Sequence, residues 1–247
     1  MNTVYQTITK KILKAITWPI VSLMSNPKIR YSIYFSIIHN SFSYSTREEM
    51  LKIAMEFAEW SRLEGDYLEF GVWRGRNLAW AYHFARKSHL DKMRFYAFDS
   101  FSGLPEPQDE DADFKQFQKG DFYCDIDTFK KNISKKGVDL NTVTIVPGWY
   151  DKTLTEETKR KIPLKKAAIV WIDCDLYEST VPVLNFITDY LEDGTILIFD
   201  DYFCFRGNPN KGEQKAFGEW LSKNPKIKVS EYHKFDWGGN SFIIHKN

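Results

Sequence analysis

The sequence predicts an α/β fold of the doubly wound, Rossmann-like type, with a mostly parallel sheet covered by helices on both faces. Three observations support this prediction. Short apolar segments alternate with segments of helical periodicity. The apolar segments lack polar alternation, as is typical of strands that are buried on both faces. Most of them end at or beside an acidic residue, where open α/β sheets bind their ligands.

Length and composition narrow the class of protein. The chain has 247 residues, of which 43% are hydrophobic, so we expect one large folded domain rather than a disordered chain. Its 34 basic and 33 acidic residues leave no overall field to attract nucleic acid, and no nucleic-acid partner is expected. Three cysteines without a C-x-x-C pair indicate neither a disulfide framework nor a zinc site, which favours a cytoplasmic location.

Residues 1–45 are predicted to form a helical cap, a lid or an oligomerisation segment, ahead of the main domain at 46–247. The stretch "TKKILKAITWPIVSLM" begins like a signal peptide, but Lys14 interrupts it and Pro19 breaks it. We therefore interpret it as part of the mature protein. A subunit contact in a homo-oligomer is favoured, and its basic and aromatic residues leave a peripheral contact with a membrane surface open.

The first elements of the main domain follow from local patterns. Thr46 and Glu49 have the spacing of a capping box, and a helix is expected over 46–62. "GDYLEFGVWRGRN" predicts a strand ending near Gly71, a tight turn and a second helix. Four further strands are predicted from "MRFYAFDS", "TVTIVPG", "AAIVWID" and "GTILIFDD".

The C-terminal part departs from this rhythm. "KIKVSEYH" and "NSFIIHK", joined by "KFDWGG", predict an antiparallel hairpin added at one edge of the sheet, which makes seven strands in all. A long polar insertion, 102–125, follows the second strand. The five histidines are scattered without metal-ligand spacing and are interpreted as structural.

A ligand site is predicted at the carboxyl ends of the first strands. Gly71 and Gly75 allow a tight turn and close approach of a ligand, although an ordinary βα turn explains two glycines equally well. Asp99, followed by Ser100, can accept hydrogen bonds from ribose hydroxyls, which points to an adenosine-containing ligand. Trp149 follows the third strand, where an adenine can stack, although a tryptophan is more often a core or pocket wall.

A second site is predicted where the fourth and fifth strands end. Asp173, Asp200 and Asp201 form an all-oxygen ligand set that favours Mg²⁺, with Mn²⁺ possible. Alternatively, Asp200 or Asp201 caps a loop and only Asp173 has a role at the site. Asp175 is interpreted as a turn cap or a contact to a substrate hydroxyl rather than a metal ligand.

Taken in order, five motifs resemble those of the macrocin O-methyltransferase (TylF/MycF-type) family: "LEFGVWRGRN", "FDSFSGLPEP", "VPGWYDKTL", "DCDLYEST" and "IFDDY". The resemblance covers residues 46–247. It implies a class I methyltransferase fold, S-adenosylmethionine as donor, Mg²⁺ as cofactor and a sugar hydroxyl as acceptor. It also implies that Glu69, Gly71 and Asp99 contact the donor and that Asp173, Asp200 and Asp201 bind the metal. Some members are thought to use a histidine base from the 102–125 region, and this stretch contains none.

The chemistry required of such an enzyme agrees with these residues. A sulfonium methyl group is already electrophilic, so the protein must align it with an oxygen and activate that oxygen. Asp173 is the predicted general base. Two alternatives remain at this level: a metal-dependent glycosyltransferase that uses the DCD motif, and a non-catalytic protein whose N-terminal segment docks a membrane or partner.

Overall fold

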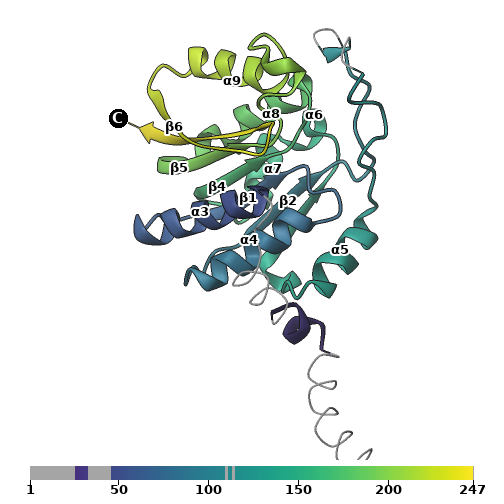
Figure 1. The fold of residues 1–247 in the computed structure, drawn as a ribbon, viewed down its shortest axis with the longest axis vertical. Helices are drawn as coiled ribbons and strands as arrows, with labels where there is room; N and C mark the ends of the chain where they lie inside the picture. The colour runs from purple at the N-terminus through teal and green to yellow at the C-terminus, as the bar shows by residue number, and fades with distance from the viewer. Residues whose placement is uncertain (1–25, 33–45, 109–110, 113–114, 247) are drawn as a thin grey trace, which may run out of the picture.

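A computed structural model describes residues 26–32, 46–108, 111–112 and 115–246. It contains a seven-stranded sheet in the order β3-β2-β1-β4-β5-β7-β6, which confirms the predicted α/β class (Figure 1). The strands are β1 (Asp66–Phe70), β2 (Phe95–Asp99), β3 (Val143–Pro147), β4 (Ala167–Ile172), β5 (Leu191–Phe199), β6 (Ile227–Phe235) and β7 (Gly239–Lys246).

The sheet is mostly parallel. Strands β1 to β5 pair in parallel, while β7 pairs antiparallel with both β5 and β6. The predicted hairpin is therefore confirmed at one edge. Because the chain winds outward from β1 to β3 and then returns to place β4 on the other side of β1, the strand order reverses between β1 and β4. Ligand sites of doubly wound sheets lie at the carboxyl side of this reversal.

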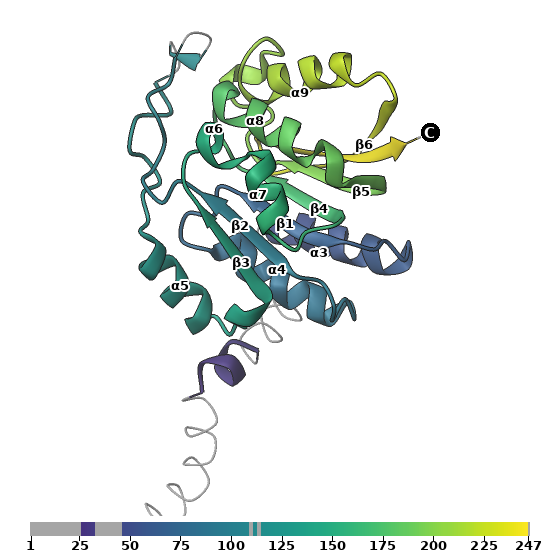
Figure 2. The same cartoon turned by 180° about the vertical axis from the view of Figure 1, so that it is seen from behind.

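Helices cover both faces of the sheet, as Figures 1 and 2 show from opposite sides. They are α3 (Thr46–Trp60), α4 (Arg76–Lys87), α5 (Ile126–Lys135), α6 (Tyr150–Thr153), α7 (Glu156–Lys161), α8 (Tyr177–Ile187) and α9 (Gly212–Lys223). Short 3-10 turns are η2 (Leu140–Thr142), η3 (Thr188–Tyr190) and η4 (Phe205–Gly207). The helix predicted over 46–62 ends two residues earlier than expected.

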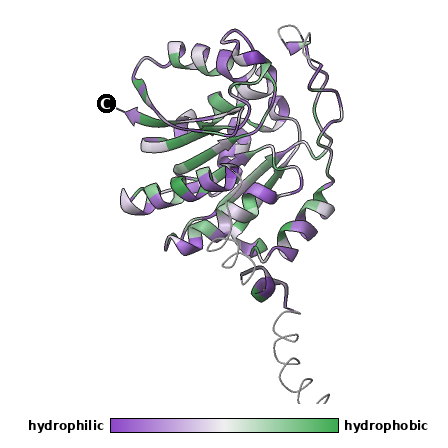
Figure 3. Ribbon diagram, viewed as in Figure 1, coloured by the Kyte–Doolittle hydropathy of each residue, from purple (hydrophilic) through white to green (hydrophobic). Residues whose placement is uncertain are grey.

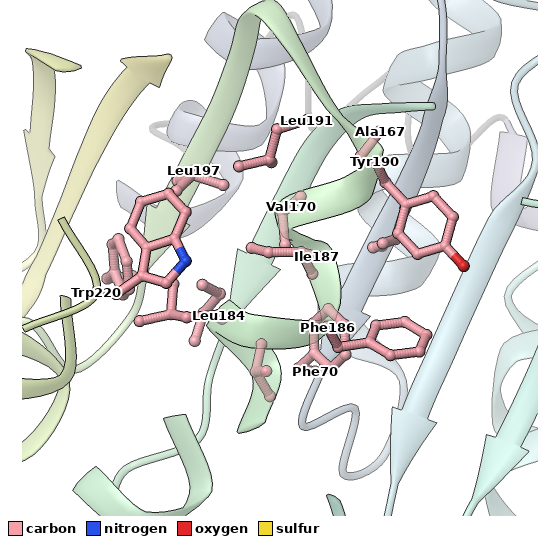
Figure 4. Packing of buried hydrophobic residues seen from close by; sticks show 14 of the residues in the cluster. Phe70, Ala167, Val170, Leu184, Phe186, Ile187, Tyr190, Leu191, Leu197 and Trp220 are labelled. Atoms are coloured by element: carbon pink, nitrogen blue, oxygen red, sulfur yellow. The ribbon is translucent and has the colours of Figure 1, made fainter. Parts of the chain in front are cut away.

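Alternate residues of the same strand enter different cores, which explains why the central parallel strands carry apolar residues on both faces. In β1, Tyr67 joins the cluster under α3 and α4, whereas Leu68 and Phe70 join the cluster under α8 and α9. Figure 4 shows this second cluster, in which Phe70 packs among residues of β4, β5, α8 and α9. Colouring by hydropathy shows hydrophobic segments on the central strands and a mixture of hydrophobic and hydrophilic residues on the helices that cover them (Figure 3).

Most of the predicted cap, lid or oligomerisation segment at 1–45 lies outside the described residues, as does its predicted membrane contact. The described part, 26–32, contains a short helical stretch at 27–32. Its Tyr31 ring stacks on the imidazole of His83 in α4, with the ring centres 4.8 Å apart. Within the described ranges, none of the helices combines the length and apolar character needed to cross a bilayer.

Candidate active site

The carboxyl ends of β1, β4 and β5 meet at one edge of the sheet. The ladder of hydrogen bonds continues one step past each strand: the Asp173 amide donates to the Phe70 carbonyl (2.8 Å), and the Asp200 amide donates to the Ile172 carbonyl (2.9 Å). Residues that lie far apart in the sequence are therefore adjacent where the strands stop. The acids predicted from the ends of β4 and β5 come from neighbouring strands, as expected.

A cavity of about 760 Å³ opens at this edge. Its volume lies within the range of small-molecule sites. It is lined by the turn after β1, by the ends of β2 to β5, by the segment after β2 and by the turn between β6 and β7. None of the described residues that line it is a histidine.

One side of the cavity, here called the glycine side, contains Glu69, Gly71, Asp99, Ser100 and Trp149. Gly71 has a φ of 86°, and a Cβ atom at this position would lie 1.9 Å from the carbonyl oxygen of Asp173. Only glycine fits here, because both the backbone conformation and the close approach of β4 exclude a side chain.

Asp99 organises the turn after β1. One carboxylate oxygen accepts hydrogen bonds from the amides of Val72 (2.8 Å) and Trp73 (3.1 Å), and the other accepts one from Phe101 (2.7 Å). Burial raises the pKa of Asp99, while these three amides oppose that shift. Each carboxylate oxygen has more than one acceptor site, so the side chain holds the turn and still lines the cavity.

The remaining residues of the glycine side differ in exposure. The Glu69 carboxyl is buried and accepts a hydrogen bond from the Tyr67 hydroxyl (2.6 Å). Burial raises the pKa of Glu69 to about 8. The Ser100 hydroxyl donates to the Gly103 carbonyl (2.9 Å) and so braces the following loop. Trp149 is 40% exposed and immediately precedes α6.

Gly75, predicted to contact the cofactor, is not among the residues that line the cavity. A Cβ atom there would lie 2.3 Å from Cγ2 of Ile133 and 2.9 Å from the ring of Phe129, both in α5. The glycine serves the close packing of α4 against α5 and a left-handed residue (φ 75°) at the start of α4. The structure thus gives Gly75 a packing role, and its contact with the cofactor stays a prediction.

The cavity is also lined by three carboxylates, which we call the acid cluster: Asp173, Asp175 and Asp201. One oxygen from each lies within 4.8 Å of the others. Burial and mutual repulsion raise the pKa of Asp173 and of Asp175 well above the usual range. Asp175, interpreted from the sequence as a turn cap or a substrate contact, is a full member of this cluster. Its backbone has a φ of 62°, in the left-handed region.

Asp200, predicted as a metal ligand, has a different environment. Its carboxylate accepts hydrogen bonds from Nε (2.7 Å) and from Nη2 (2.8 Å) of Arg47 at the start of α3. The same guanidinium also donates through Nη1 to Asp236 (2.9 Å). The carboxylates that converge therefore differ from the predicted metal ligands. Asp200 is paired with Arg47, which lies 153 residues away in the sequence, and Asp175 lies with Asp173 and Asp201 instead.

The acid cluster has the chemistry of a site for a hard divalent cation. Three converging carboxylates are unfavourable without a cation between them, and oxygen ligands suit Mg²⁺ or Mn²⁺. Glu213 of α9 fixes the two loops that carry these acids, since it accepts hydrogen bonds from the amides of Cys174 (3.3 Å) and Asp201 (3.1 Å). The residues present therefore fit such an ion.

Three functional residues were not predicted from the sequence: Arg47, Asp111 and Glu213. Asp111, in the insertion after β2, is fully buried and accepts hydrogen bonds from the amides of Tyr177 (2.6 Å) and Gly212 (3.1 Å). It fastens the insertion to the first turns of α8 and α9. The partners of Arg47 and Asp111 are distant in sequence, so no local pattern reports them, and Glu213 resembles any glutamate in the first turn of a helix.

Comparisons with known proteins identify relatives of this chain. The chain is 28% identical over 159 residues to the mycinamicin III 3''-O-methyltransferase of Micromonospora griseorubida, which covers 62% of this chain and 61% of that protein. It is 27% identical over 183 residues to the 8-demethyl-8-(2,3-dimethoxy-alpha-L-rhamnosyl)-tetracenomycin-C 4'-O-methyltransferase of Streptomyces olivaceus, with 72% of this chain and 68% of that protein covered. The chain thus spans about three fifths to two thirds of the length of these curated relatives.

Solved structures share the fold. The O-methyltransferase NovP superposes with a TM-score of 0.70 at 22% identity, covering 82% of this chain and 80% of that chain. The calicheamicin methyltransferase CalS11 superposes with a TM-score of 0.61 at 20% identity, covering 87% and 91%. An O-methyltransferase from Bacillus cereus, solved in complex with SAH, has a TM-score of 0.52 at 13% identity, covering 85% and 94%.

The family model for macrocin O-methyltransferase (TylF) matches residues 40–214, a range that includes the glycine side and the acid cluster. This match extends over more than half of the chain and contains the turn after β1 and the ends of β2 to β5. The chain belongs to the macrocin O-methyltransferase (TylF) family.

Proposed function

We propose that this protein is an Mg²⁺-dependent O-methyltransferase that transfers a methyl group from S-adenosylmethionine to a hydroxyl of a sugar in a glycan or glycoside. One observation carries the proposal: a single cavity is lined both by the glycine side and by the acid cluster. Family membership supports the O-methyl transfer, and the name of the Streptomyces olivaceus relative, which contains a rhamnosyl group, supports the sugar acceptor.

The glycine side is the proposed donor site. Asp99 lies where a ribose hydroxyl can donate to it, and the exposed indole of Trp149 offers a stacking face for adenine. Gly71 lines the cavity and lets the backbone of Asp173 approach closely, which brings the proposed donor site next to the acid cluster. The SAH bound by the Bacillus cereus neighbour supports a donor of this type.

The acid cluster is the proposed acceptor site. Asp173, Asp175 and Asp201 would hold the cation, which when bound neutralises the carboxylates and lowers the pKa of a neighbouring hydroxyl. Asp173 is the group positioned to take the hydroxyl proton. The hydroxyl oxygen then forms a bond to the methyl carbon as the carbon–sulfur bond breaks, leaving S-adenosylhomocysteine and protonated Asp173.

The test is transfer of labelled methyl from S-adenosylmethionine to methyl α-L-rhamnopyranoside and to TDP-rhamnose. We expect product with Mg²⁺, none with EDTA, and recovery when excess Mg²⁺ is added back. Thermal-shift measurements compare S-adenosylhomocysteine with UDP-glucose under the same conditions. Stabilisation by UDP-glucose and not by S-adenosylhomocysteine would instead identify a glycosyltransferase.

A further inference from the structure

Trp237, in the turn between β6 and β7, has a large, solvent-exposed side chain and is one of the residues that line the cavity. It is 63% exposed and lines the cavity beside the acid cluster. Trp60, at the end of α3, is 85% exposed but is not among the lining residues. An isolated exposed tryptophan has no special meaning, so the significance of Trp237 depends on how its turn is held.

The turn is fastened against the loop that carries Asp200. The Gly238 carbonyl accepts a hydrogen bond from the Phe203 amide (2.7 Å). A Cβ atom on Gly238 would lie 3.2 Å from the Asp200 carbonyl oxygen, so the two backbones are in close contact. Asp236 has a φ of 52°, a conformation that costs energy for a residue with a side chain. The backbone of the turn that carries Trp237 is thus fixed against the Asp200 loop.

Arg47 connects this turn to the acids. Its Nε and Nη2 bind Asp200, next in sequence to Asp201 of the acid cluster, and its Nη1 binds Asp236, next in sequence to Trp237. The Asp236 carboxylate also accepts a hydrogen bond from the Trp237 amide (2.9 Å). One guanidinium therefore ties the turn that carries Trp237 to the loop that carries Asp200 and Asp201.

We propose that Trp237 is the stacking platform for the pyranose ring of the acceptor, and that Asp236, held by Arg47, is the positioning residue for this platform. This inference rests on the proposed function and adds the acceptor subsite to it. A pyranose has an apolar face of C–H groups and a rim of hydroxyls. The apolar face suits the exposed indole, and the hydroxyl rim suits the carboxylates beside it. The ring is therefore held by its face while one hydroxyl faces Asp173.

The test measures binding of methyl α-L-rhamnopyranoside to the full chain loaded with S-adenosylhomocysteine and Mg²⁺, by saturation-transfer NMR. We expect Trp237→Ala to weaken binding about tenfold, and Trp237→Phe to retain most of it, because a phenyl ring still offers a stacking face. Asp236→Ala, which leaves Asp200 paired with Arg47, should weaken binding about threefold while the affinity for S-adenosylhomocysteine is unchanged. Trp60→Ala is the matched control and should bind as the wild type does.

L-Rhamnitol provides the second control, because it carries similar hydroxyls without a ring. We expect weak binding of rhamnitol that does not depend on Trp237. Equal affinity of wild type and Trp237→Ala for the rhamnoside would overturn the platform. So would loss of affinity in Trp237→Ala for a p-nitrophenyl rhamnoside only, since Trp237 would then contact the aglycone. Failure of the wild type to bind S-adenosylhomocysteine would instead reject the proposed function itself.

Discussion

The glycine side and the acid cluster line the same cavity but differ in their interactions. Hydrogen bonds and close packing hold the glycine side together, whereas the carboxylates of the acid cluster repel one another. On the glycine side, Asp99 accepts three backbone hydrogen bonds, and Gly71 fits a space that no side chain can occupy. In the acid cluster, three carboxylates converge, and burial together with the neighbouring acids raises the pKa of Asp173 and of Asp175. The first region is complete in shape and hydrogen bonding before a ligand arrives, whereas the second needs positive charge to complete it.

This difference indicates how the two regions will respond to change. Substitutions on the glycine side act mainly through packing and folding, because its residues hold one another. Substitutions in the acid cluster act mainly through binding and chemistry, because its residues oppose one another in the absence of a cation.

The largest expected effect is on catalysis. Asp173→Asn keeps the size of the side chain but removes the charge and the proton acceptor. We expect methyl transfer to fall by a factor of about 1,000 or more, or roughly 4 kcal/mol in the barrier. Calorimetry should find the affinity for S-adenosylhomocysteine unchanged. The control is Asp189→Asn, at a carboxylate that is 65% exposed, and it should keep full activity. Loss of donor binding in Asp173→Asn would mean that the two regions are not separable.

The second prediction concerns the stability of the folded protein and tests the close packing at Gly71 on the glycine side. Gly71→Ala places a methyl group 1.9 Å from a backbone oxygen, and we expect a loss of about 4 kcal/mol or more in the free energy of unfolding. Gly120→Ala is the matched control, because Gly120 has nearly the same φ, 85°, with no atom within 4 Å of the added carbon. It should cost about 1 kcal/mol. Similar urea midpoints for the two variants would contradict the close approach of β1 and β4.

The third prediction concerns the dependence of stability on pH. The pKa of Glu69 is about 8 in the folded protein, compared with 4.5 in the unfolded chain. At pH values between these two, the folded state therefore binds more protons than the unfolded state. The contribution of Glu69 to stability is therefore full below pH 4.5 and decreases as the pH rises to 8. Glu69→Gln should remove this decrease. Relative to the wild type, the metal-free variant should gain on the order of 3 kcal/mol between pH 5 and pH 8, measured by urea unfolding. Parallel profiles would show that Glu69 is ionised in the folded protein.

The smallest expected effect is on thermal stabilisation by ligands, which tests whether Mg²⁺ and S-adenosylhomocysteine bind to different regions of the cavity. At a concentration one hundred times its dissociation constant, Mg²⁺ should stabilise the protein by about 2.7 kcal/mol, seen as a rise in melting temperature. Asp201→Asn should reduce this rise and leave the rise caused by S-adenosylhomocysteine intact. Asp99→Asn should reduce the rise caused by S-adenosylhomocysteine and leave the rise caused by Mg²⁺ intact. An Mg²⁺ response that depends on Asp99 would place the cation on the wrong side of the cavity.

The sequence predicted the fold well because its signals are local. Both faces of β1, β2 and β4 are covered, so each strand carries apolar residues on both faces, and the strand ends are marked by Gly71, Asp99 and Asp173. The hairpin of β6 and β7 was also predicted from its own residues. Parallel strands bring their carboxyl ends together, and so the position of the site followed from the fold.

The details of the site were less predictable because they depend on contacts between distant residues. Nothing near Asp200 indicates that Arg47 pairs with it, and nothing near Gly75 indicates that α5 packs against it. Asp175 enters the cluster through a left-handed backbone turn that a non-glycine residue rarely adopts. Spacing along the chain identifies which strand ends carry acids, but not which acids converge.

The most direct test of the two-sided cavity is a crystal structure of the protein grown with Mn²⁺ and S-adenosylhomocysteine, with the metal located by its anomalous scattering. We expect the metal peak among the carboxylates of Asp173, Asp175 and Asp201, with the ribose of the ligand on Asp99. A peak elsewhere, or an adenosine lying over the acid cluster, would contradict the division of the cavity into a donor side and an acceptor side.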